Sequence, residues 1–143
     1  MFNILIINGP NLNLLGEREK DKYGKLSINE IKKSCLSFSK KHNIKLSFFQ
    51  SNIEGEIVEK IQNSRNDYQG IIINAGGYTH TSVSIRDALK DFDGYIIEIH
   101  MSNIHAREEF RKISMISGVS DGLIVGFGPD SYYLALKAIT SKL

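Results

Sequence analysis

Short apolar segments rich in β-branched residues alternate along the chain with longer segments whose apolar residues recur at helical spacing. Short apolar runs of this kind are typical of buried strands, whereas apolar positions three and four residues apart are typical of amphipathic helices. The sequence therefore predicts strands at Phe2–Asn8, Ile44–Gln50, Gly70–Asn74, Gly94–His100 and Gly122–Gly126. It predicts helices near Ile28–His42, Glu54–Asn66, Thr81–Lys90, Ala106–Met115 and Ser131–Lys142.

Strands that are apolar on both faces and separated by helices favour a parallel sheet with helices on both faces. The 143 residues fit an open doubly wound sheet better than an eight-stranded barrel, which needs ~250 residues. No linker, composition break or internal repeat divides the chain. We therefore expect residues 1–143 to form a single α/β domain.

The first and last helices carry the clearest local signals. Ser27-Ile-Asn-Glu30 is a capping box, in which the serine and glutamate side chains satisfy free N–H groups at the helix start. We expect Asp130 or Ser131 to cap the last helix. The predicted apolar stripes are Ile28, Ile31, Cys35, Leu36 and Phe38 in the first helix, and Tyr133, Leu136, Ala138 and Ile139 in the last.

Composition excludes several classes of protein. The hydrophobic fraction of 41% supports a core, and no apolar run approaches the ~20 residues of a membrane span. The N-terminus lacks the basic region of a signal peptide, and a net charge of +2 is too small to indicate nucleic-acid binding. The single Cys35 fits a reducing compartment and is expected to be a buried helix residue. We therefore expect a cytoplasmic protein without a nucleic-acid or membrane partner.

Ligands of open α/β sheets bind outside the carboxyl ends of the strands, and three of the segments that follow strands are unusually polar. The first, Asn8–Gly24, is far longer than the ~2–6 residues of a usual connection between strand and helix. It contains Asn11, Arg18 and Tyr23 among many charged residues. Such a segment is either a lid over a binding site or a solvated charged loop.

The second polar segment is Asn74–Ser82. Its paired glycines permit tight or left-handed turns and close approach of the backbone to a ligand. One hydroxyl residue among Thr79, Thr81 and Ser82 is expected to cap the next helix, with His80 at its start. Taken alone, a histidine such as His80 is more often a cap or packing residue than part of a site, and Asn74 at a strand end could simply bond to neighbouring backbone.

The third segment begins inside the fourth strand. It holds Glu98, His100, Ser102, Asn103, His105, Arg107 and Arg111. Arg107 and Arg111 are four residues apart and would share one face of the predicted helix. The alternative is a salt-bridged surface with Glu108 and Glu109. Because three consecutive polar clusters at one sheet edge suggest a common purpose, we favour a binding site.

The residues of these segments exclude several chemistries. There is no CxxC, no HExxH, no GxSxG elbow, and no cluster with convincing metal-ligand spacing. Arg, Asn and Ser bind carboxylates and hydroxyls, while His and Tyr move protons. An adjacent arginine stabilises a phenolate and so lowers the pKa of a tyrosine. A Tyr–Arg pair can therefore act as a general base without a cofactor.

Three ordered motifs closely resemble those of the type II 3-dehydroquinate dehydratases. They are Ile7-Asn-Gly-Pro-Asn-Leu-Asn-Leu-Leu-Gly-x-Arg-x-x-x-x-Tyr-Gly24, Tyr78-Thr-His-Thr-Ser-Val-x-Ile-Arg-Asp-Ala88 and Glu98-Ile-His-x-Ser-Asn-x-His-Ala-Arg-Glu-Glu-Phe-Arg111. The resemblance implies a flavodoxin-like fold with a five-stranded parallel sheet. It also implies dehydration of 3-dehydroquinate to 3-dehydroshikimate, the third step of the shikimate pathway, through an enolate and without metal or cofactor. The family usually assembles as a dodecamer of four trimers.

The resemblance also implies a role for each matching residue. Tyr23 would remove the substrate C2 proton, Arg18 would lower the pKa of Tyr23, Asn11 would stabilise the enolate, and His100 would protonate the departing hydroxyl. The implied substrate-binding residues are Asn74, His80, Asp87, Met101, Ser102 and Arg111, with Asp87 reaching a neighbouring subunit's site. Glu98 would orient His100, and Arg107 would order the lid.

Two rival interpretations come from other classes of protein. A non-catalytic binder such as a signalling receiver would need an acidic pair after the first strand to hold Mg²⁺, and Asn8-Gly-Pro-Asn11 supplies none. An inactive relative or pure assembly protein would have no need of intact Asn11, Tyr23 and His100. The usual Asn-Pro-Gly-Ala turn of the family reads Asn74-Ala-Gly-Gly77 here, which touches none of the named catalytic groups.

Overall fold

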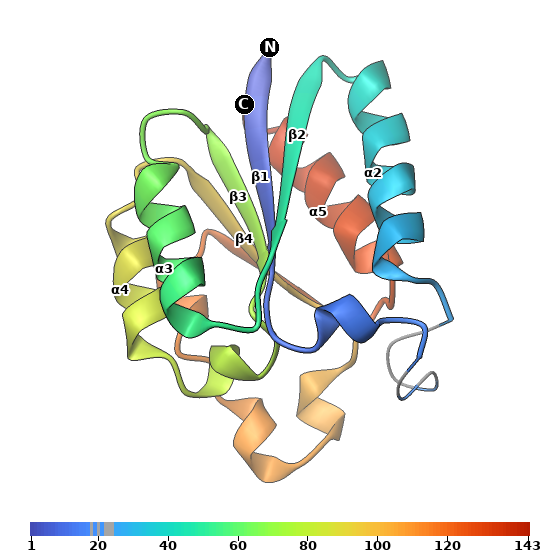
Figure 1. Ribbon diagram of the computed structural model, residues 1–143, viewed down its shortest axis with the longest axis vertical. Coiled ribbons are helices and arrows are strands. Elements are labelled where there is room, and N and C mark those ends of the chain that lie inside the picture. The colour runs from blue at the N-terminus through green and yellow to red at the C-terminus, as the bar shows by residue number, and fades with distance from the viewer. Residues whose placement is uncertain (18, 20, 22–24) are drawn as a thin grey trace.

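A computed structural model of the chain describes residues 1–17, 19, 21 and 25–143. Its centre is a five-stranded, all-parallel sheet of order β2-β1-β3-β4-β5 (Figure 1). The strands are β1 (Phe2–Asn8), β2 (Ile44–Gln50), β3 (Gly70–Asn74), β4 (Tyr95–His100) and β5 (Gly122–Val125). This confirms the predicted parallel sheet, with strand ends within one residue of the expected positions.

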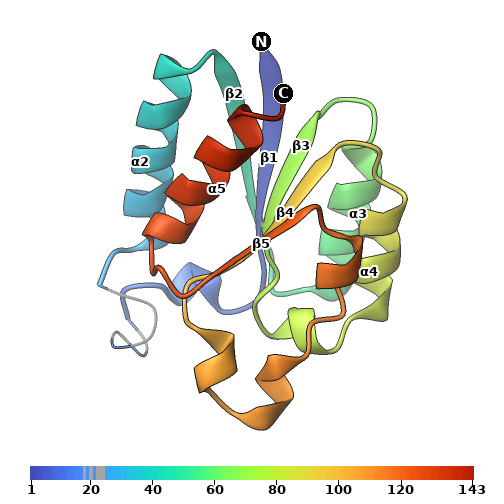
Figure 2. The same cartoon turned by 180° about the vertical axis from the view of Figure 1, so that it is seen from behind.

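Helices cover both faces of the sheet, as predicted. One face carries α2 (Ile28–Lys41) and α5 (Asp130–Thr140), and the other carries α3 (Glu54–Asn63) and α4 (Val83–Lys90), as Figure 2 shows from behind. Successive side chains of β1 point to opposite faces of the sheet. Ile4 and Ile6 therefore pack in the core beneath α2 and α5, and Leu5 and Ile7 in the core beneath α3 and α4. No helix in the described part of the chain is long and apolar enough to cross a membrane.

Helix starts follow local hydrogen-bond chemistry in two of the predicted cases. Ser27 Oγ accepts a hydrogen bond from the backbone N–H of Glu30 (3.2 Å), and Ser82 Oγ accepts one from Ile85 (2.9 Å). The cap predicted for α5 is wrong, because Asp130 is already helical and Pro129 precedes it without a side-chain cap. A proline with its fixed φ can begin a helix without one.

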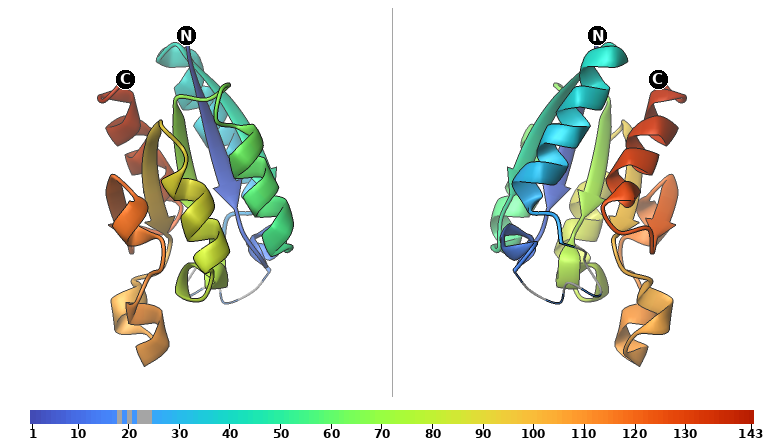
Figure 3. Two further views of the ribbon diagram at one scale, coloured as in Figure 1. Left: turned by 90° about the vertical axis from the view of Figure 1, so that its left-hand side faces the viewer. Right: turned by 90° about the vertical axis from the view of Figure 1, so that its right-hand side faces the viewer.

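The helix predicted at Ala106–Met115 is wrong. Two short 3₁₀ turns, Ile104–Ala106 and Glu109–Lys112, occupy this region, with extended backbone at Arg107 between them. Most helical stability comes from burying an apolar face. Two large apolar side chains of this range, Phe110 and Ile113, are 61% and 64% exposed, and only Met115 at its end packs against the core. Figure 3 shows this segment projecting beyond the carboxyl edge of the sheet, where no neighbouring layer covers it.

The strand order reverses between β1 and β3, which lie side by side while their connections lead to helices on opposite faces. At this point the backbone of the segment after β1 directly contacts the backbone of the segment after β3. The N–H of Gly9 donates to the carbonyl of Asn74 (2.8 Å), and a Cβ on Gly9 would lie 2.3 Å from the Ala75 carbonyl oxygen. Gly76 (φ 60°) makes the matching approach to Pro10. Only glycine permits this contact.

We expect Gly9→Ala to lower the free energy of unfolding by about 1–3 kcal/mol or more, because the added methyl overlaps backbone that cannot move aside. Gly55→Ala, where a Cβ on Gly55 meets nothing within 4 Å, is the matched control and should leave stability unchanged or slightly higher. Denaturant unfolding of both variants measures the difference. Equal stability of the two variants would contradict the close contact.

Candidate active site

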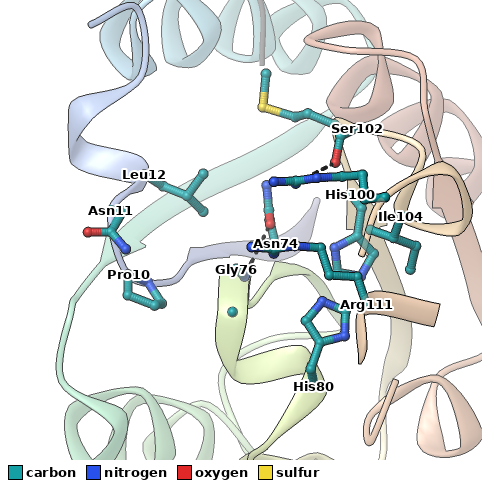
Figure 4. A pocket seen from close by; sticks show the side chains of 13 residues that line it. Pro10, Asn11, Leu12, Asn74, Gly76, His80, His100, Ser102, Ile104 and Arg111 are labelled. Carbon is teal, nitrogen blue, oxygen red and sulfur yellow. Dashed lines mark hydrogen bonds between the residues drawn. The ribbon is translucent and has the colours of Figure 1, made fainter. Parts of the chain in front are cut away.

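A polar pocket lies at the carboxyl edge of the sheet, where the segments after β1, β3 and β4 meet (Figure 4). Seven of the residues predicted for the site line it: Asn11, Asn74, His80, His100, Met101, Ser102 and Arg111. Pro10, Leu12, Gly76, Gly77, Ile104 and Arg107 complete the lining. The sheet thus brings together residues from three distant parts of the sequence, as the polar clusters predicted.

One predicted site residue in the described part of the chain, Asp87, is not among the residues that line this pocket. Asp87 lies exposed on α4, where its carboxylate pairs with Arg86 (2.9 Å). Its predicted function was in a neighbouring subunit's site. Arg18 and Tyr23 lie outside the described residues.

His100, the last residue of β4, is buried and held by Glu98. The two residues are two apart on a strand, so their side chains share one face. The Nε2 atom of His100 lies 2.5 Å from Glu98 Oε2. A carboxylate only accepts, so Nε2 carries the proton of this bond, and Nδ1 is the ring nitrogen left for other partners. This hydrogen bond restricts the orientation of the His100 ring.

Glu98 is 0% exposed, and a cluster of hydroxyl groups surrounds its carboxylate. Ser114 Oγ donates to Oε2 (2.9 Å), Thr79 Oγ1 donates to the same oxygen (3.4 Å), and Ser117 Oγ donates to Oε1. Burial by itself raises the pKa of Glu98. The hydrogen bonds and charge of His100, together with the two serines, outweigh burial and hold the pKa below its ordinary value. The carboxylate is therefore ionised at neutral pH.

His80 faces His100 across the pocket, with ring centroids 6.3 Å apart. Its Nδ1 lies 2.7 Å from the carbonyl oxygen of Ile113, so this nitrogen donates and Nε2 can accept. Burial lowers the pKa of His80, and the nearby charges of His100 and Arg111 lower it further, against the opposing effect of the Ile113 bond. A neutral His80 offers a hydrogen-bond acceptor to a hydroxyl group.

Two asparagines of the pocket, Asn11 and Asn74, are held by hydrogen bonds to Asn52, Tyr132 and Gly76. The side-chain oxygen of Asn52 accepts from the backbone N–H of Asn11 (2.9 Å), which has left-handed backbone (φ 68°). The amide of Asn74 donates to the hydroxyl of Tyr132 (3.2 Å) and accepts from the N–H of Gly76 (3.3 Å). Asn11 lies exposed at the rim of the pocket and Asn74 is buried at its floor.

Arg107 and Arg111 both line the pocket, although the helix that was expected to align them is absent. Arg107 donates to Ser102 Oγ (3.1 Å) and lies 3.8 Å from the carboxylate of Glu19 in the long loop after β1. Arg111 pairs with Glu108, so the salt-bridged surface considered from sequence also exists. Figure 4 shows Arg111 beside both His100 and His80.

Sequence reasoning missed several supporting residues. They are Asn52, Thr79 as a donor to Glu98, Ser114, Ser117 and Tyr132. Helical periodicity could have indicated Tyr132, which shares a face with Ala135, Leu136 and Ile139. The serines carry no such signal, because their approach to Glu98 depends on the irregular path of the chain after β4.

The arrangement can bind an anionic, hydroxylated molecule and transfer a proton to it. Arg111 supplies a cation for a carboxylate, Asn74, Ser102 and His80 supply groups for hydroxyls, and the Glu98–His100 pair supplies a proton carrier. Within residues 1–17, 19, 21 and 25–143, no three His, Cys, Asp or Glu side chains are grouped so that they could hold a metal ion.

Comparisons with known proteins agree with this chemistry. The family described as "Dehydroquinase class II" matches residues 2–140. A 3-dehydroquinate dehydratase of Prochlorococcus marinus subsp. pastoris is 55% identical over 142 residues, which are 99% of this chain and 97% of the relative. One from Nitratiruptor sp. is 52% identical, over 96% of this chain and 88% of the relative. The solved type II dehydroquinase of Butyrivibrio crossotus superposes with a TM-score of 0.95 at 44% identity, covering 96% of this chain and 97% of that chain.

We expect Ser117→Ala to raise the pKa of Glu98 and to destabilise the fold by about 1.5–3 kcal/mol near neutral pH, because a bond to an ionised group is lost. The wild-type pKa of Glu98 lies below its ordinary value. The stability that the Ser117 bond contributes is therefore fully present above about pH 5 and disappears as the pH falls through that lowered pKa.

Denaturant unfolding between pH 3 and pH 8 checks this expectation. Ser120→Ala is the matched control, because Ser120 Oγ donates to the carbonyl of Ile116 (2.8 Å) and not to Glu98. A difference between wild type and Ser117→Ala that does not depend on pH would contradict it.

Proposed function

The chain belongs to the class II dehydroquinase family, and from this premise we propose how its pocket converts 3-dehydroquinate to 3-dehydroshikimate, a step of the shikimate pathway. The observation that carries the proposal is the buried Glu98–His100 pair, which faces a pocket lined by Asn74, His80 and Arg111. The reaction removes water, so it needs a base for one proton and an acid for the departing hydroxyl.

The base is Tyr23. Its phenolate takes the proton from C2 of the substrate, and the electron pair moves onto the C3 carbonyl oxygen to give an enolate. The Arg18 cation favours the phenolate form of Tyr23 at neutral pH. Asn11, at the rim of the pocket, stabilises the enolate through an ordered water, an electrostatic contribution that acts on the charge as it develops.

The acid is His100. As the enolate collapses, the C1–oxygen bond breaks and the leaving hydroxyl takes the proton of His100, so that one water leaves and a C1–C2 double bond forms. Glu98 holds the imidazole in one orientation and compensates its positive charge before the proton is given up. The proton on Tyr23 returns to His100 through solvent, which completes the cycle.

The remaining lining residues bind the substrate. Arg111 and the backbone N–H groups of Met101 and Ser102 hold the carboxylate. Asn74 and Ser102 bind hydroxyls, and neutral His80 accepts a hydrogen bond from another at Nε2. Arg107 links the floor of the site to Glu19, which lies between Arg18 and the base Tyr23 along the chain. That contact supports a role in placing the lid.

We infer the wider setting from the same premise. The strands of one sheet extend from Phe2 to Val125, which supports a single catalytic domain over residues 1–143. Asp87 is exposed and does not line the pocket of its own chain, which supports a trimer whose subunits share sites. By the family resemblance, four such trimers form a homododecamer. The lone buried Cys35 supports a cytoplasmic location.

We expect the purified protein to turn over 3-dehydroquinate, followed by the ultraviolet absorbance of the conjugated product. Turnover should persist in the presence of a chelator, and after borohydride treatment with substrate, because the proposed steps use neither a metal nor a lysine imine. A folded sample without turnover would refute the function. Inactivation by borohydride would indicate a covalent mechanism.

We expect Tyr23→Phe to lower kcat by about 10²–10⁴-fold, the usual contribution of a general base, with KM changed by less than about threefold. Tyr68→Phe is the control, since Tyr68 precedes β3 at the opposite edge of the sheet. Steady-state kinetics of both variants decide the assignment, and a near-normal kcat for Tyr23→Phe would refute it.

A further inference from the structure

A buried tyrosine joins the two strand ends on which the pocket is built. Tyr132 is 1% exposed in the first turns of α5. Its hydroxyl donates to the side-chain oxygen of Asn8 (2.5 Å), the last residue of β1. The same hydroxyl accepts from the side-chain nitrogen of Asn74 (3.2 Å), the last residue of β3. Asn8, Tyr132 and Asn74 thus form a hydrogen-bonded chain beneath the site.

The direction of these bonds decides which way the amide of Asn74 faces. Tyr132 gives its only hydrogen to Asn8, so toward Asn74 it presents a lone pair, which only an N–H can meet. The N–H of Gly76 fixes the other side, because it must point at the oxygen of Asn74 (3.3 Å). A flipped amide would oppose oxygen to oxygen at Tyr132 and N–H to N–H at Gly76.

We propose that Tyr132 is a positioning residue for catalysis, which holds the amide of Asn74 in the one orientation that binds substrate. This proposal rests on the proposed function, in which Asn74 contacts a substrate hydroxyl. Asn74 lines the pocket, whereas Tyr132 does not, so Tyr132 acts only through Asn74.

The environment of Tyr132 keeps its hydroxyl neutral, so that its two hydrogen bonds keep the same direction. Burial raises the pKa of its phenol above the ordinary range, despite the bond from Asn74. The hydroxyl therefore keeps its proton at any pH at which the protein works, and the donor and acceptor pattern does not change. Removal of the hydroxyl would take one buried partner from the side-chain oxygen of Asn8 and one from the side-chain nitrogen of Asn74, and only the bond from the N–H of Gly76 would still hold the amide of Asn74.

The next residue along the helix is a matched control. Tyr133 is 41% exposed, its ring packs edge-on against Phe38, and it lines no part of the pocket. Tyr132→Phe and Tyr133→Phe each remove one oxygen atom from adjacent positions of α5. Only Tyr132→Phe removes a hydrogen bond to a residue that lines the pocket, Asn74.

The test is steady-state kinetics with 3-dehydroquinate. We expect Tyr132→Phe to raise KM about tenfold, the factor that ~1.4 kcal/mol of lost binding produces, with kcat changed much less. Tyr133→Phe should match wild type. In an Asn74→Ala background, Tyr132→Phe should add no further increase in KM, because the group that it positions is gone.

Unchanged KM for folded Tyr132→Phe, or an equal increase in KM with and without the Asn74 amide, would overturn the proposal while leaving the function intact. If Tyr132→Phe does not fold, Asn8→Ala is the alternative. It removes the acceptor of the Tyr132 hydroxyl at the end of β1, which frees the hydroxyl to turn away from Asn74, and it should also raise KM. An unchanged KM in that variant would overturn the proposal equally.

A second measurement is independent of turnover. Thermal unfolding of the Tyr132→Phe, Asn74→Ala and double variants should show non-additive losses in Tm, since the two side chains share a bond. Additive losses would refute the bond itself. Coupling in Tm without wild-type turnover would refute the proposed function, and with it the positioning role, while leaving the hydrogen-bonded chain established.

Discussion

Burial of an ionised carboxylate at Glu98 is the constraint on which the rest of the site depends. An isolated charge in a protein interior is very costly unless it is paired and hydrogen-bonded. The chain meets that requirement with donors from several segments: the imidazole of His100, the hydroxyl of Thr79 after β3, and Ser114 and Ser117 after the two 3₁₀ turns. Satisfying one charge therefore ties together the parts of the chain that form one wall of the pocket.

The opposite wall depends on close backbone contact rather than charge. Gly9 and Gly76 let the segments after β1 and β3 meet without side chains between them. Asn52 then holds the backbone of Asn11, and the hydroxyl of Tyr78 donates to the carbonyl of Asn52 (2.7 Å). The family usually has another residue where this chain has Gly77. That difference leaves the contact in place, because the residue with left-handed backbone in this turn is Gly76.

The sheet could be predicted from the sequence, because the central strands β1, β3 and β4 are buried on both faces and leave short, β-branched apolar runs between helical patterns. The sequence could also predict that Asn11, Asn74, His80, His100 and Arg111 meet, because parallel strands deliver their carboxyl ends to one edge. It failed at Ala106–Met115, where helical spacing was present but no surface was available to bury Phe110. In α5 it placed Leu136 and Ile139 correctly in the core but also placed Tyr133 and Ala138 there, where the structure buries Tyr132 and Ala135 instead. Adjacent helix residues point about 100° apart, so Tyr132 and Tyr133 face different surroundings. The tyrosine beneath the site was therefore not recognised.

The Glu98–His100 and Glu108–Arg111 ion pairs differ in how a bound substrate can affect them. Glu98 is completely buried and has several donors, so an incoming anion cannot take His100 from it. Glu108 is 48% exposed and holds Arg111 at the surface, where solvent and salt weaken the attraction. Under the proposed function, a substrate carboxylate replaces Glu108 at the guanidinium of Arg111 without leaving a buried charge behind. Exposure thus separates the pair that positions the proposed proton donor, His100, from the pair that opens when the proposed substrate binds to Arg111.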